Sequence, residues 1–137
     1  MTEPNLYIKS RVSAIRRIMY QKALTQEEIN HVCSTTSLRK MYSGNDRVRM
    51  STADKLYQYL IENYNTEYRA EGVPFKEWHD TIFNEMEVYR QKIGMKKSVF
   101  ANILGIHSVQ YYDLIRGVRV SGKKLWKAYQ NYKRWKI

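Results

Sequence analysis

Residues 97–117 read KSVFANILGIHSVQYYDLIRG, and the spacing of their apolar residues and glycines predicts two short helices joined by a tight turn. The first helix is expected within residues 97–106 and the second within residues 107–117. Ala101 is small enough for two helices to cross closely at its position. Gly105 can adopt the positive φ that a sharp turn after a helix requires. The stretch therefore predicts a compact helical hairpin rather than one continuous helix.

Apolar residues on both sides of the turn supply the contacts that would hold this hairpin together. Ile106 follows the turn glycine and can fill the gap between the helices. In the second helix, Tyr111 and Leu114 share one face, which is expected to point inward. Gly117 ends that helix. The pattern resembles the helix-turn-helix of the Cro/phage-repressor (Xre) family, and the resemblance extends over roughly residues 89–132.

The resemblance implies which side chains would meet DNA. In that family, the second helix of the motif lies in the major groove with its N-terminal residues at base edges. Carried over to this sequence, the base-reading residues are Ser108, Val109, Gln110, Tyr112 and Asp113. The residues implied to contact phosphates are Lys97, Arg116, Arg119, Lys123, Lys124 and Lys127.

Three of the carried-over residues have a definite chemical preference. The Gln110 amide can pair with adenine through two hydrogen bonds, and Val109 can contact a thymine methyl group. Asp113 would bring a negative charge to the groove. It is compatible with DNA if it accepts a hydrogen bond from cytosine N4 or if it pairs with Arg116.

The charge of the chain is concentrated in its second half. The 137 residues include 24 Lys and Arg against 13 Asp and Glu, a formal net charge of +11. Residues 1–87 hold 12 of each sign, whereas residues 88–137 hold 12 cations and one acid. Cations at this density repel one another unless an anionic partner neutralises them, and nucleic acid is the commonest such partner. The hydrophobic fraction of 43% is enough for a core, which argues against a disordered basic tail.

Helical spacing of apolar residues continues along the rest of the chain, interrupted by only two prolines and six glycines. Strand signals are weak. We therefore predict an all-α protein of two small helical subdomains, residues 1–68 and residues 69–137. By the resemblance, the second subdomain is a Cro/repressor-type helix-turn-helix bundle. Residues 63–74 are polar and contain Gly72 and Pro74, which indicates a linker.

The two halves also resemble one another. Leu38, Met41 and Gly44 have the same spacing as Tyr111, Leu114 and Gly117. A Val-Arg-x-Ser tetrapeptide also occurs in each half, at Val48–Ser51 and at Val118–Ser121. These matches predict an internal duplication with a period of about 70 residues. Residues 15–64 would then form a degenerate copy of the helix-turn-helix.

The segment 124–136 alternates aromatic and basic residues and allows two interpretations. Exposed aromatic rings between cations would stack on the bases of a single strand. Alternatively, the segment is a final amphipathic helix whose inward residues, three and four apart, are Leu125, Ala128, Tyr129 and Tyr132. The spacing favours the helix, and Trp135 and Ile137 could then serve a contact in a homodimer.

No residue pattern for catalysis, a metal or a cofactor is found, so we expect no enzyme activity, metal site or cofactor. The histidines at 31, 79 and 107 share no metal-ligand spacing with Cys33. A single cysteine excludes an intrachain disulfide and is typical of a reducing compartment. No apolar run reaches the roughly 18 residues of a membrane span, and the first residues lack a signal-peptide pattern. A cytoplasmic protein without membrane contact, nucleoid-associated if bacterial, is expected.

The sequence therefore favours sequence-specific binding of double-stranded DNA. By the resemblance, the protein would be a phage or bacterial transcriptional regulator. Two other hypotheses stay open. One is a small phage-type inhibitor or anti-repressor that holds a host protein, with the charge-balanced residues 1–87 as the contact. The other is binding of single strands or RNA through residues 124–136.

Overall fold

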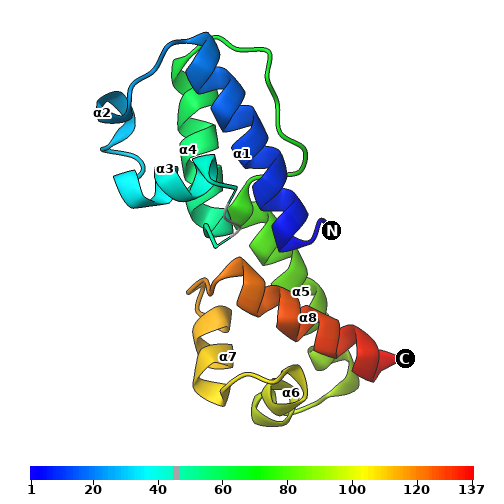
Figure 1. The fold of residues 1–137 in the computed structure, drawn as a ribbon. Coiled ribbons are helices and arrows are strands. Elements are labelled where there is room, and N and C mark those ends of the chain that lie inside the picture. Colours follow the sequence, from blue (N-terminus) through cyan, green and yellow to red (C-terminus); the bar gives the residue numbers. More distant parts are fainter. Residues whose placement is uncertain (45–46) are drawn as a thin grey trace. The chain divides into compact units, whose positions relative to one another are not determined.

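The structure is a computed structural model that describes residues 1–44 and 47–137. These residues form helices joined by turns and loops, with no strand among them, which confirms the all-α prediction. The chain divides into two units, Thr2–Phe75 and Lys76–Ile137 (Figure 1). The first four helices are α1 (Pro4–Gln21), α2 (Gln26–Ile29), α3 (Thr35–Tyr42) and α4 (Met50–Asn63). The next four are α5 (Phe75–Ile93), α6 (Lys97–Leu104), α7 (Ser108–Ile115) and α8 (Gly122–Lys136).

In the N-terminal unit, α1 packs along α4, and the two helices lie side by side in Figure 1. Tyr7, Ile15 and Ile18 are spaced to fall on one face of α1, and all three are fully buried. Leu56 and Leu60 of α4 are buried in the same way. The core of this unit is therefore the seam between its two long helices, with α2 and α3 added to it.

Residues 64–74, here called the strap, return along α1 instead of forming the free linker that their polar composition indicated. The Ser10 hydroxyl oxygen accepts a hydrogen bond from the Glu71 backbone N–H at 3.0 Å. The Tyr57 hydroxyl oxygen accepts one from the Ala70 N–H at 2.9 Å, and the Tyr7 hydroxyl donates to the Val73 carbonyl at 2.9 Å. The predicted boundary after residue 68 thus falls inside a segment that is fastened to the N-terminal unit.

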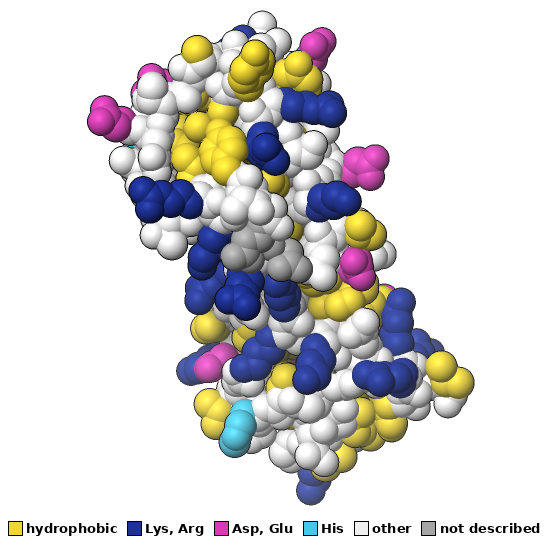
Figure 2. All heavy atoms as spheres, viewed as in Figure 1, with side chains coloured by type: hydrophobic (Ala, Val, Ile, Leu, Met, Phe, Trp, Pro, Cys, Tyr) yellow, Lys and Arg dark blue, Asp and Glu magenta, His cyan; other side chains and the backbone are white. Residues whose placement is uncertain are grey.

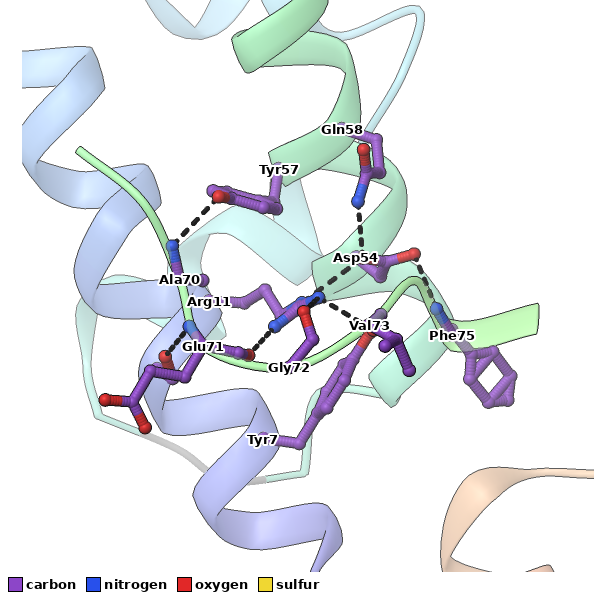
Figure 3. A network of polar contacts seen from close by, with 11 residues as sticks. Tyr7, Arg11, Asp54, Tyr57, Gln58, Ala70, Glu71, Gly72, Val73 and Phe75 are labelled. Carbon is purple, nitrogen blue, oxygen red and sulfur yellow. Dashed lines mark hydrogen bonds and ion pairs between the residues drawn. The ribbon is translucent and has the colours of Figure 1, made fainter. Parts of the chain in front are cut away.

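A fully buried guanidinium, that of Arg11, holds the strap in place (Figure 3). Its nitrogens donate to the backbone carbonyls of Glu71, Gly72 and Val73. Its Nε donates to Asp54 of α4 at 3.2 Å. Composition gave no sign of this arrangement, because the acceptors are backbone carbonyls, which every residue carries.

The C-terminal unit has an aromatic core. Phe100 of α6 is fully buried, with its ring 5.7 Å from that of Tyr111 in α7 and 6.2 Å from that of Tyr132 in α8. Phe83 of α5 reaches the Tyr111 ring at 5.6 Å. All four helices of this part of the chain therefore meet around Tyr111 and Phe100, in the geometries that aromatic pairs prefer.

The segment 124–136 forms most of α8, and its inward face is the predicted one. Leu125, Ala128, Tyr129 and Tyr132 are buried, as the amphipathic interpretation requires. Trp126 stacks on Trp78 at 6.0 Å, and Trp135 packs edge-on against Tyr89 at 5.9 Å. The aromatic rings of this helix pack against other rings of the unit, although Trp135 is 37% exposed, and this packing weakens the interpretation as a stacking surface for single strands.

The two units repeat one order of helices, long, short, short and long, and also one pattern of burial. Most buried positions of α1 and α4 have buried counterparts in α5 and α8; the exceptions are Ala14, Ile18, Met19 and Asp54. The pairs are Pro4/Phe75, Tyr7/Trp78, Ile8/His79, Arg11/Ile82 and Ile15/Met86, then Met50/Gly122, Ala53/Leu125, Leu56/Ala128, Tyr57/Tyr129 and Leu60/Tyr132. The internal similarity that the sequence indicated is therefore present in the burial of the long helices.

The register of that similarity differs from the one that the shared tetrapeptide gave. Ser51 lies inside α4, which begins at Met50, whereas Ser121 precedes α8 and caps it by accepting from the Lys124 N–H at 3.3 Å. The two serines are therefore not equivalent, and the match of Val48–Ser51 with Val118–Ser121 was wrong in register. The buried faces of the helices, rather than identical residues, determine which positions of the two units correspond.

The turn that follows the first long helix of each unit, α1 or α5, is repeated as well. Its residue with positive φ differs between the two units. Gly94 has φ +70, and the Met95 N–H bonds the Arg90 carbonyl at 3.1 Å. In the N-terminal unit, Ala23 takes the same place with φ +50, where the equivalent hydrogen bond runs from Leu24 to Met19 at 2.9 Å. An alanine in the left-handed region costs about 1–2 kcal/mol that glycine does not.

Candidate nucleic-acid interface

The α6–α7 pair is built around one tight turn, as the sequence predicted. Gly105 has φ +76, and a Cβ built there would lie 3.1 Å from the Asn131 side-chain nitrogen. Ala101 is fully buried, and its carbonyl accepts from the Ile106 N–H at 3.1 Å. The Asn131 amide of α8 donates to the Leu104 carbonyl at 2.9 Å and so caps the end of α6. The turn is therefore held from both sides.

The inner face of α7 is anchored by a polar network as well as by packing. The Tyr111 hydroxyl, on a buried ring, donates to Glu87 of α5 at 2.6 Å. Arg90 donates to both oxygens of Glu87, at 2.6 and 3.0 Å, and to the Met95 carbonyl at 2.7 Å. Burial would raise the pKa of Glu87, but these hydrogen bonds outweigh it and lower that pKa. The carboxylate therefore stays ionised and fixes α7 against α5.

The outer face of α7 carries the five residues that the resemblance assigned to base reading. Val109 is 65% exposed and Tyr112 is 48% exposed. Ser108, Gln110 and Asp113 are half-buried beside them. The structure thus places these five side chains together on one helix, with an apolar and an aromatic group projecting farthest.

Two lysines from other helices lie against α7. The ammonium of Lys97, the first residue of α6, is 5.1 Å from the centre of the Tyr112 ring. Lys124, in the first turn of α8, lines the same small cavity as Gln110. Both α6 and α8 therefore bring a lysine of their first turn close to α7.

The N-termini of α6 and α8 carry cations where helix electrostatics favours anions. A helix N-terminus has a partial positive charge, which Asp or Glu in the first turn would stabilise. Neither helix has an acid there, and the first turn of α8 carries Lys123 and Lys124, both exposed. Lys127, one turn further, is exposed too. This arrangement is unfavourable for the isolated helix and favourable for an anion bound at its start.

Two of the predicted phosphate contacts are engaged with acids of the protein itself. Arg116 forms an ion pair with Asp113, the residue three positions before it in the chain. That pair removes the objection to an anion on α7, because the carboxylate is neutralised within the helix. Arg119 donates to both oxygens of Asp80 in α5, at 2.7 and 3.2 Å. Both pairs are partly solvent-exposed, where ion pairs contribute only about 0–1 kcal/mol, so phosphate could compete for either arginine.

The loop between α7 and α8 is held by a buried histidine that sequence reasoning left without a role. His79 is 2% exposed, and its Nε2 accepts a hydrogen bond from the Val120 N–H at 3.2 Å. Its Nδ1 lies 3.3 Å from Asp80, which in turn holds Arg119. Burial lowers the pKa of His79, although Asp80 acts in the opposite direction. The neutral ring, whose unprotonated Nε2 accepts from the Val120 N–H, is the form that this position requires.

We expect the stability of the C-terminal unit to fall as the pH drops below 6.5. Unfolded His79 takes up a proton near its ordinary pKa of 6.5, whereas the folded pKa is lower, so the unfolded state binds more protons between these values. The contribution of the neutral His79 ring to the free energy of unfolding is therefore complete above pH 6.5. It is lost as the pH falls through the pKa of His79 in the folded state. All three tryptophans lie in this unit, so urea unfolding followed by tryptophan fluorescence at pH 7.5 and 5.5 measures it. In His79→Gln the difference should shrink, and an unchanged difference would refute the assignment.

Most acids of this unit are occupied by contacts within it. Residues 76–137 contain 13 Lys and Arg against five Asp and Glu, a net charge of +8. Four of the five carboxylates bond a named side chain: Asp80 with Arg119, Glu85 with Tyr129, Glu87 with Arg90 and Asp113 with Arg116. Among the charged side chains on the face of this unit shown in Figure 2, Lys and Arg accordingly prevail over Asp and Glu. The unit therefore carries more cations than its own acids can neutralise.

Sequence reasoning missed the acids that support the interface. The Glu87–Arg90 pair is three residues apart on one helix, so its spacing could have revealed it. The contact between Asp80 and Arg119 joins residues 39 positions apart, and no local pattern points to it.

Comparisons of this chain with protein-family models, with curated proteins and with solved structures found no match. Within residues 1–44 and 47–137, no three His, Cys, Asp or Glu side chains gather as they would around a metal ion. None of the helices that the structure describes combines the length and the apolarity needed to cross a membrane.

Proposed function

We propose that the C-terminal unit binds double-stranded DNA through a helix-turn-helix formed by α6 and α7, with α7 in the major groove. The supporting observation is an exposed helix flanked by the lysine-bearing starts of two others. Lys97 contacts Tyr112 on one side of α7, and Lys124 shares a cavity with Gln110 on the other. Helix N-termini with lysines are suited to phosphates, and a helix between them is suited to base edges.

The residues divide into two roles in this proposal. Ser108, Val109, Gln110 and Tyr112 face the bases, while Asp113 orients Arg116 toward the backbone. Phosphates are bound by Lys97, Arg116, Lys123, Lys124 and Lys127, and by Arg119 if DNA displaces Asp80. The first group gives sequence preference, and the second gives a salt-sensitive affinity for any duplex.

From this mode of DNA binding we propose a cellular role in transcriptional regulation, of the Cro/phage-repressor kind. That class of function is supported by the residues of the α6–α7 turn, Ala101, Gly105 and Ile106, whose placement has the form that the family resemblance implies. The charge excess of the unit supports a nucleic-acid partner independently of the resemblance.

Replacing Gln110 by alanine should relax sequence preference at a single position of the bound site. A site is first obtained by selecting bound duplexes from a random pool with the full chain. Loss of a bidentate base contact is expected to reduce discrimination at that position by about 1–3 kcal/mol and to leave random duplexes bound as before. Gln130→Ala, an exposed glutamine of α8, is the matched control and should change neither quantity. Equal losses on selected and random duplexes would contradict the placement of α7.

A further inference from the structure

The N-terminal unit presents α3 as the C-terminal unit presents α7. Both helices have eight residues and follow a polar N-cap residue, Ser34 or His107. Both are followed by a glycine with positive φ, Gly44 at +74 and Gly117 at +92. The glycine N–H bonds the carbonyl three residues earlier in each case, at 3.4 Å in the first unit and 3.1 Å in the second.

The two helices also agree position by position in what they expose. Leu38 and Met41 are buried, as are Tyr111 and Leu114. The residues in between follow the same order of exposure. Thr36 and Arg39 are exposed like Val109 and Tyr112, and Thr35, Ser37 and Lys40 are half-buried like Ser108, Gln110 and Asp113. The outward face of α3 is therefore equivalent to the face of α7 that we assign to base contacts.

The chemistry of that face suits nucleic acid. Residues 34–44 contain no acid, and α3 has Lys40 where α7 has Asp113. Its outward side chains are hydroxyls, an arginine and a lysine, all of which can donate hydrogen bonds to phosphates and bases. Lys9, Arg16 and Arg17 of α1 line one groove with the C-terminal end of α3, which adds positive charge beside it.

We infer that α3 is a second DNA-contacting helix, so that the N-terminal unit is a second duplex-binding unit rather than a scaffold. The inference rests on the proposed function of α7, since equivalence to α7 is the argument. The helix before α3 differs from its counterpart. α2 has four residues where α6 has eight, and it starts with Gln26 where α6 starts with Lys97. The N-terminal unit therefore binds DNA more weakly than the C-terminal unit, with fewer phosphate contacts.

The test is the number of short duplexes that one chain binds. A mixed-sequence duplex of about 12 base pairs offers roughly one helical turn, enough for one recognition helix. At low salt, titration in the analytical ultracentrifuge should show two such duplexes per full-length chain. Arg39→Ala with Lys40→Ala should reduce that number to one. Lys97→Glu with Lys124→Glu should also leave one duplex, now held by α3.

Two controls separate a specific effect from lost charge or lost folding. Lys22→Ala with Lys55→Ala removes the same charge from exposed positions outside α3 and should still bind two duplexes. Circular dichroism shows whether the α3 variant is folded. Arg39→Gln with Lys40→Gln, which keeps more of each side chain, is measured if the alanine pair unfolds.

The outcomes distinguish the inference from the proposal on which it rests. One duplex per wild-type chain, lost when Lys97 and Lys124 are reversed, would overturn the inference and leave the function of α7 intact. Two duplexes that persist in the α3 variants would overturn it as well. No duplex bound at low salt would overturn both.

Discussion

Replacing Arg11 by alanine is expected to lower the free energy of unfolding of the N-terminal unit by about 3–5 kcal/mol. The guanidinium is fully buried and serves the Asp54 carboxylate and three backbone carbonyls of the strap. Its removal takes the cationic partner from the Asp54 carboxylate, which is 7% exposed, and leaves it with neutral donors such as the Gln58 amide and the Phe75 N–H. An uncompensated buried charge and unpaired carbonyls are costly together.

The measurement uses the absence of tryptophan from residues 2–75. Tryptophan fluorescence follows only the C-terminal unit, whereas amide hydrogen exchange in α1 and α4 follows the N-terminal one. The loss of stability in Arg11→Ala should appear in the amide hydrogen exchange of α1 and α4 and not in the tryptophan fluorescence. Arg16→Ala, an exposed arginine on the same helix, is the control and should change stability by no more than about 0.5 kcal/mol.

A double-mutant cycle separates the ion pair from the packing of the arginine. Asp54→Ala alone should also be costly, because it removes the carboxylate that pairs with a buried cation. The double variant should cost clearly less than the sum of the two single changes. Additive effects would show that the pair is not the stabilising contact.

Comparison with the C-terminal unit indicates why the N-terminal unit has an arginine at position 11. Its counterpart in the C-terminal unit is Ile82, which is buried in the same place on α5. The helical core therefore does not require a charge there. The N-terminal unit differs in having a strap of eleven residues, 64–74, and Arg11 fastens it by donating to its carbonyls.

Reversing the charge of Lys97 and Lys124 together is expected to weaken duplex binding on the order of 100-fold or more near 0.1 M salt. Each phosphate contact releases counterions and contributes about 0.9 to the slope of log affinity against log salt concentration. The slope should therefore become shallower by about two. Both lysines lie in the first turn of a helix beside α7, so their replacement by glutamate also brings anions next to the groove.

The matched control has the same change in net charge at two exposed positions of α5. Lys76→Glu with Lys92→Glu lowers the charge of the unit by the same four units. It should reduce the affinity for duplex DNA only severalfold at low salt, because it weakens the long-range electrostatic attraction. The slope of log affinity against log salt concentration should stay the same. An equal loss in the control would mean that the cations act as a diffuse charge and that α7 is not the contact.

Much of the C-terminal unit could be predicted from the sequence, because its signals are local. Gly105 marks the turn, Ala101 marks the close contact, and the spacing of Leu125, Ala128 and Tyr129 marks the inward face of α8. Each depends on residues a few positions apart. These are the distances over which a helix repeats its faces.

The contacts that fasten distant segments could not be predicted in this way. His79 and Val120, and Arg119 and Asp80, meet only after α5 and the α7–α8 loop have packed. The strap was misjudged for the same reason, since the polar letters of residues 63–74 do not show that a buried guanidinium binds their carbonyls. The repeat was visible in the sequence, but its register at Ser51 was wrong because identical letters fell at different helix positions.

The most direct test of DNA binding by this protein is its affinity for a mixed-sequence duplex and for one strand of that duplex, measured across salt concentrations by fluorescence anisotropy. We predict tighter binding of the duplex, with log affinity falling steeply and linearly with log salt concentration, by about 0.9 per phosphate contacted. No affinity for either form at low salt, or a preference for the single strand, would contradict the account.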